Sequence, residues 1–127
     1  MTLAYWCVFV AAILPSFWTL SYRWAGAGYS LEDNLAPRLY QETLTGWRQR
    51  AHWAHLNGLE TFPVFATAVV VAHQLGGSLS LVNALSVTYV VLRIGHGIFY
   101  VTNLGAMRTL TYFGSQLCVI AIFLSLV

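Results

Sequence analysis

The stretch RAHWAHLNGLETFPVFATAVVVA, residues 50–72, decides the fold. It opens with a charged and polar segment and then continues into apolar sequence. If the segment is helical, one face carries every third or fourth residue, namely Arg50, Trp53, Asn57 and Glu60. From Thr61 to Leu92 the chain has no Asp, Glu, Lys or Arg. The stretch therefore predicts a membrane-spanning helix that takes ionisable side chains into the bilayer, where such residues usually serve a function.

The composition places most of the chain in lipid. It is 58% hydrophobic and only 8% charged, whereas soluble domains typically have about 25% charged residues. With 127 residues, the chain is long enough for one domain, residues 1–127, and not for two. The net charge of +2 is too small and too scattered for a nucleic-acid partner. Membrane lipids are the expected surroundings.

Four uncharged or nearly uncharged stretches are long enough to cross the bilayer, which requires about 20 apolar residues. We expect the spans at 2–22, 47–75, 79–102 and 108–126. A glycine pair within residues 74–80 separates the second span from the third. The polar connection at residues 23–50 is expected to hold a short surface helix near 36–45. The predicted fold is an all-α, integral membrane four-helix bundle.

The arginines indicate the orientation. They lie in the first loop and around the third, at Arg23, Arg38, Arg48, Arg50, Arg93 and Arg108. The positive-inside bias therefore predicts that both termini lie on the non-cytoplasmic side. A signal peptide is the alternative, because residues 25–27 resemble a cleavage site, but no positive segment precedes the apolar run. The lack of a targeting presequence and the short loops favour a bacterial inner membrane.

The third span carries the segment RIGHGIFY, residues 93–100, in which Arg93, His96 and Tyr100 share one helical face. Arg93 lies within an apolar run and needs a partner. Glu60 is the expected one, because the second and third spans are neighbours and both side chains reach inward from the same side. Glu60 itself lies about 15 Å along its helix from the loop, at 1.5 Å per residue, where a charge is costly to bury.

The fourth span begins with RTLTYFGSQ, residues 108–116, which places Arg108, Tyr112 and Ser115 on one face. Arg108 and Tyr112 are expected at the same level as Tyr100. Taken singly, such arginines and tyrosines are common anchors at the membrane interface. A purely structural ion-pair network is an alternative for the deeper polar residues, whereas a ligand-binding polar site explains their shared depth and faces better. His52 and His55 lack a third ligand, so no metal site is predicted.

At these residues the sequence resembles the MAPEG superfamily, the membrane-associated proteins of eicosanoid and glutathione metabolism. Residues 50–72 resemble the second-helix motif of that family. RIGHGIFY followed by MRTLTY, residues 107–112, is similar to the third- and fourth-helix motif of the microsomal prostaglandin E synthases in it. The family also includes microsomal glutathione transferases. The resemblance implies four-helix protomers assembled as a homotrimer, in which glutathione acts as a thiolate donor to lipophilic substrates.

The resemblance also implies roles for individual residues. Asn57 and Glu60 match glutathione contacts, His96 and Tyr100 match site residues of the third helix, and Thr109 replaces a neighbouring hydroxyl residue. The expected catalytic residues are Arg108, which matches the arginine that stabilises the thiolate, and Tyr112. The predicted ligand-binding residues are Arg38, Arg50, Asn57, Glu60, Arg93, His96, Tyr100 and Thr109.

One position departs from the family. Its enzymes commonly have an arginine four residues before the asparagine, and here that position is Trp53. Loss of a bidentate carboxylate clamp weakens the binding of a ligand with two carboxylates. Two functions are therefore compatible with the sequence. One is a glutathione-dependent transferase or peroxidase for a lipophilic electrophile, and the other is a non-catalytic lipid-binding or scaffold protein of the same fold.

Overall fold

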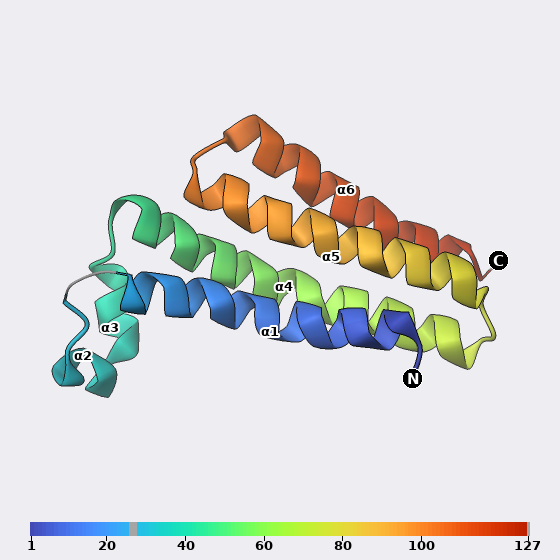
Figure 1. Cartoon of the computed structure of the whole chain (residues 1–127), viewed down its shortest axis with the longest axis horizontal. Helices are drawn as coiled ribbons and strands as arrows, with labels where there is room; N and C mark the ends of the chain where they lie inside the picture. Colours follow the sequence, from blue (N-terminus) through green and yellow to red (C-terminus); the bar gives the residue numbers. More distant parts are fainter. Residues whose placement is uncertain (26–27, 127) are drawn as a thin grey trace.

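A computed structural model describes residues 1–25 and 28–126. Its helices are α1 (Leu3–Trp24), α2 (Leu31–Leu35), α3 (Pro37–Glu42), α4 (Gly46–Gln74), α5 (Leu79–Val101) and α6 (Gly105–Leu124). The four long helices lie side by side, with both chain termini at one end of the bundle and α2 and α3 at the other (Figure 1). The cleavage-like segment at residues 25–27 falls mostly outside the described residues, as does the last residue of the predicted domain.

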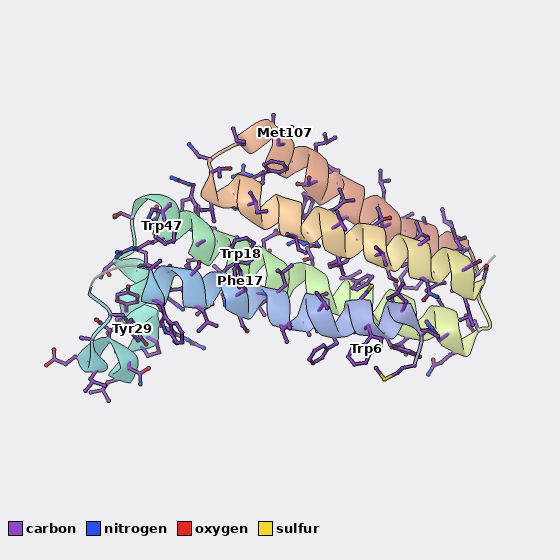
Figure 2. All side chains as sticks on the ribbon, viewed as in Figure 1. Trp6, Phe17, Trp18, Tyr29, Trp47 and Met107 are labelled. Atoms are coloured by element: carbon purple, nitrogen blue, oxygen red, sulfur yellow. The ribbon has the colours of Figure 1, made fainter. Side chains whose placement is uncertain are left out.

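The prediction of an all-α membrane four-helix bundle is confirmed. Within the described ranges, four helices are long and apolar enough to cross a membrane. Their outward side chains are large and apolar: Phe17, Val91 and Leu117 are each more than 60% exposed, and Trp6 points away from the bundle (Figure 2). Such surfaces are compatible with lipid and not with water. The homotrimer stays a prediction.

The polar connection forms the short helix expected near 36–45, which is α3, and a second short helix, α2, before it. Ser30 and Asp33 form a capping box at the start of α2, which satisfies backbone donors that the helix leaves free. Pro37 opens α3 at a position where its missing N–H costs nothing. The side chain of Gln41 donates a hydrogen bond to the Tyr22 hydroxyl at 3.0 Å. This bond ties α3 to the end of α1.

The main apolar core lies between α1, α4, α5 and α6. At its centre the rings of Phe65 and Tyr89 stack with centroids 3.8 Å apart. Many of the other core residues are small, which allows the helices to approach closely. The buried core comprises Ala4, Cys7, Ala11, Phe65, Ala68, Val69, Ala72, Val82, Tyr89, Cys118, Val119 and Ile122. Both cysteines are free thiols within it.

Two glycines set how α1 sits on its neighbours. A Cβ at Gly97 would overlap the ring of Trp18, and a Cβ at Gly58 would lie 2.8 Å from the Pro15 side chain. His55 Nδ1 donates a hydrogen bond to the Pro15 carbonyl at 2.9 Å. Because these contacts leave no room for a larger side chain, they determine the rotation of α1 against α4 and α5.

Candidate ligand site between α4, α5 and α6

Most of the predicted site residues line one open cavity of about 220 Å³, to which three helices contribute. Its walls consist of Asn57 from α4, His96 and Tyr100 from α5, and Arg108, Thr109 and Tyr112 from α6. We call this space the arginine cavity. Six residues that lie up to 55 positions apart therefore converge, as the helical spacing within each segment predicts.

The turn between α5 and α6 brings the two halves of the arginine cavity together. Asn103 lies in this turn with a φ of 63°, the left-handed conformation that asparagine adopts more readily than most residues. The chain reverses there, so the first turn of α6 lies beside the last turn of α5 (Figure 1). As a result, the Arg108 guanidinium lies over the Tyr100 ring, 4.6 Å from its centroid, in a cation–π contact.

A second cavity of about 180 Å³ adjoins the first and shares Asn57 and Tyr100 with it. We call it the glutamate cavity, because Glu60 lies in its wall together with Trp53 and Leu56. The Trp53 and Tyr100 rings are 6.4 Å apart, centroid to centroid. The one carboxylate of the site therefore shares its cavity with the Trp53 indole and not with Arg93.

The expected ion pair between Glu60 and Arg93 is not formed. Arg93 is buried and donates a hydrogen bond from Nη2 to Asn57 Oδ1 at 2.7 Å, whereas the Glu60 side chain is exposed on the outside of α4. Desolvation favours this arrangement, because an amide oxygen accepts from Nη2 without taking a second charge out of solvent, which an ion pair at this depth requires.

His96 is buried between α5 and α6. Its Nδ1 donates a hydrogen bond to the carbonyl oxygen of Arg108 at 3.0 Å. The rings of Tyr100 and Tyr112 pack against the imidazole, with centroids 5.4 and 5.9 Å away. His96 therefore holds the first turn of α6, and with it the backbone of Arg108, against α5.

Arg50 and Arg38 lie outside the arginine cavity. Arg50 Nε donates to the carbonyl oxygen of Val101 at 3.0 Å, which satisfies an acceptor left free at the end of α5. Arg38 is exposed and lines a third, larger cavity of about 500 Å³ between α3 and α4. Trp53 and Leu56 lie in the walls of both this space and the glutamate cavity, so they separate the two.

Sequence reasoning missed part of these walls. Leu56 is apolar and carries no chemical signal, and Gln49 of the α3 cavity went unnoticed although it lies one helical turn before Trp53. Across residues 1–25 and 28–126, no three His, Cys, Asp or Glu side chains gather closely enough to hold a metal ion.

The arginine cavity suits an anionic group. It offers a guanidinium, two phenols and a hydroxyl, with no carboxylate in its wall. Because Asn57 Oδ1 already accepts from Arg93, the free part of this amide is its Nδ2, a donor. The adjoining carboxylate of Glu60 suits an amine. A polar ligand with anionic groups and an amine therefore matches the two cavities together.

Comparison with known proteins identifies the family of the chain. No curated protein and no solved structure shows significant similarity to the chain. The model of the MAPEG family, however, matches residues 3–127, and its members are membrane proteins of eicosanoid and glutathione metabolism. The match covers all four long helices and both motifs that form the cavities. The chain therefore belongs to the MAPEG family.

Proposed function

We propose that the protein is a membrane-embedded, glutathione-dependent transferase or peroxidase that acts on a lipophilic electrophile. The observation that carries the proposal is the position of Arg108, whose guanidinium faces an open polar cavity beside Asn57 and Tyr112. Family membership supports a membrane function of this general kind. We propose the reaction and the roles of the individual residues on the basis of the cavity geometry.

The residues present fit glutathione in part. The ligand has a thiol, an amine and two carboxylates. Arg108 and the Nδ2 of Asn57 are the groups that would hold anionic parts, and Glu60 is the group that would hold the amine. Trp53 stands where the family's enzymes commonly have an arginine, so one carboxylate has no bidentate partner in the glutamate cavity. We therefore expect weak glutathione binding.

Bound glutathione supplies a thiol, which reacts as its thiolate with electrophilic carbon or with a peroxide. Arg108 favours the anionic form of a sulfur in the arginine cavity by its charge. Tyr112 and Thr109 add hydroxyl donors from the same face of α6. Tyr100 holds the guanidinium through the cation–π contact, which limits the positions that the charge can take before a ligand arrives.

The wall of the glutamate cavity provides an entry for an apolar substrate. Trp53 and Leu56 line this cavity and are also more than 40% exposed on the outside of α4. These two side chains offer an apolar surface that leads from the outside of α4 into the cavity. We propose that a lipophilic substrate reaches the polar site along this surface.

The test uses the purified full chain in detergent. Glutathione is titrated while thermal stability and the ultraviolet absorbance of the thiolate are measured. A ligand that binds only the folded state raises apparent stability, by about 2.7 kcal/mol at a concentration 100 times Kd. We expect Arg108→Ala to abolish the thiolate absorbance. Arg48→Ala is the matched control, because Arg48 lies against Trp47 at the start of α4 and should leave the absorbance unchanged.

The role of Arg108 is refuted if Arg108→Ala forms as much thiolate as the parent protein. A stability shift with fatty acid and none with glutathione would instead support the second candidate, a non-catalytic lipid-binding protein. That candidate rests on Trp53, which puts an indole 6.4 Å from the Tyr100 ring in the cavity that the amine and a carboxylate would occupy.

A further inference from the structure

A small cavity lies inside the bundle, behind the arginine cavity. It is enclosed by α1, α4 and α5, and the space open to the centre of a water molecule within it is about 10 Å³. This is roughly the space that one water requires. Most of its wall is apolar, and the polar residues in it come from α4 and α5, namely Thr61, Tyr89, Arg93 and His96.

Arg93, which lines this cavity, has a free hydrogen-bond donor. Its side chain is only 5% exposed, and Nη2 is taken by Asn57. The other terminal nitrogen, Nη1, is buried and has no hydrogen-bond partner in the described ranges. Because buried polar groups in native proteins nearly always have a partner, either protein or ordered water, the free Nη1 needs an acceptor.

His96, which lines the same cavity, has a free hydrogen-bond acceptor. The residue is only 3% exposed, and its Nδ1 faces the carbonyl oxygen of Arg108. A carbonyl can only accept, so Nδ1 carries the proton, and Nε2 of the neutral ring is an acceptor. Nε2 is buried and has no partner among the described residues. It needs a donor.

Tyr89 adds a second acceptor. It is 1% exposed, and its hydroxyl donates to the backbone oxygen of Thr61 at 3.4 Å. The donor is thereby used, whereas the phenolic oxygen can still accept. Three residues of the cavity wall thus have unused hydrogen-bonding capacity, a donor on Arg93 and acceptors on His96 and Tyr89.

We propose that this cavity binds one ordered water molecule. The water accepts a hydrogen bond from Arg93 Nη1 and donates to His96 Nε2 and to the Tyr89 oxygen, which gives it the three bonds typical of buried water. A small anion fits less well, because it would face the lone pair of Nε2. A dry void fits less well still, because two buried nitrogens would stay without partners.

The water would act as a positioning element for the arginine cavity. Arg93 holds the side chain of Asn57, and His96 holds the backbone of Arg108. A water bound to both Arg93 and His96 therefore connects the α4 wall of the arginine cavity to its α6 wall through α5. This inference concerns the free protein, and it stands or fails independently of the proposed activity.

The experiment is a high-resolution structure of the full chain in lipid, determined once in sodium chloride and once in sodium bromide, together with nitrogen NMR of the histidine rings. We expect one density peak within hydrogen-bond distance of Arg93 Nη1 and His96 Nε2, no anomalous bromide signal, and a His96 ring protonated at Nδ1 alone. An empty cavity, a bromide signal, or a proton on Nε2 would each overturn the proposal.

A variant of His96 tests whether its acceptor nitrogen is needed to hold the water. His96→Phe keeps an aromatic ring in place but removes the acceptor, so we expect the peak to disappear. His73→Phe is the control, because His73 bonds Thr2 and the backbone of Val69 and does not line this cavity, and there the peak should stay. If the peak persists in His96→Phe at full occupancy, the bonding scheme is wrong. If that variant does not fold, the density in the parent protein still decides the question.

Discussion

At the end of the bundle that carries the chain termini, α1, α4 and α5 meet through residues such as Ala4, Ala72 and Val82. At the end where α5 turns into α6, the same helices meet through Arg93, His96 and Asn57. We call the end with the chain termini the terminal end, and it is packed with apolar side chains. We call the end with the α5–α6 turn the polar end, and it carries the arginine and glutamate cavities and the cavity behind them.

The difference shows that burying polar groups is not what assembles this bundle. Ionisable side chains in a bilayer are costly, and apolar packing of the same helices is available one or two turns away. Polar groups that gather around open space are better explained by a ligand than by stability. The following predictions test whether stability and ligand binding do separate along the bundle in this way.

The largest effect is expected at the centre of the apolar core. Phe65→Ala removes a fully buried ring that stacks on Tyr89, and it should lower the free energy of unfolding by about 3–5 kcal/mol, because it leaves a cavity. Chemical denaturation in detergent measures this. Phe17→Ala, on the lipid-facing side of α1, is the control and should cost far less. An equal loss in both variants would contradict the assigned core.

At the polar end, the effect should fall on chemistry. If the proposed function holds, Arg108→Ala should lower kcat/KM for a generic electrophile about 10²–10³-fold, the size typical when one stabilising donor of a developing anion is lost. The free energy of unfolding should change little, since Arg108 is only half-buried. A variant that loses stability and activity together would mean that the two ends do not differ as described.

Trp53→Arg should strengthen glutathione binding. The substitution puts a guanidinium in the glutamate cavity, at the position where the family's enzymes commonly have one. A hydrogen bond to a charged group contributes about 1.5–3 kcal/mol, so we expect Kd to fall by roughly tenfold or more. Trp53→Gln is the control, because it opens the same space without a charge. Equal gains in both variants would show that space, and not charge, limits binding.

The smallest effect is expected at a polar contact of the terminal end. Thr2 and His73 are joined by a hydrogen bond of 2.7 Å between Oγ1 and Nε2. Thr2→Ala should lower the free energy of unfolding by about 0.5–1.5 kcal/mol, the usual net contribution of one such bond, and leave glutathione binding unchanged. Weaker ligand binding in this variant would indicate that the two ends are coupled.

The four membrane helices and the family could be predicted from the amino-acid sequence. Hydropathy and charge are local properties, and a run such as Thr61–Leu92 without a charged residue leaves few alternatives in a bilayer. The spacing of Asn57, Tyr100 and Arg108 within their segments also indicated which faces carry polar chemistry. All three residues line the arginine cavity, and Asn57 and Tyr100 also line the glutamate cavity.

The hydrogen-bond partners of the polar side chains could not be predicted from the sequence and became clear from the packed bundle. Spacing places a residue on a face but does not say how far its helix is rotated or shifted against the next one. Those quantities depend on close packing, as where Gly97 meets Trp18. They are the reason that Arg93 bonds Asn57 and not Glu60. They also turn Arg50 toward the end of α5, and they leave a space behind His96 that no periodicity in the sequence predicts.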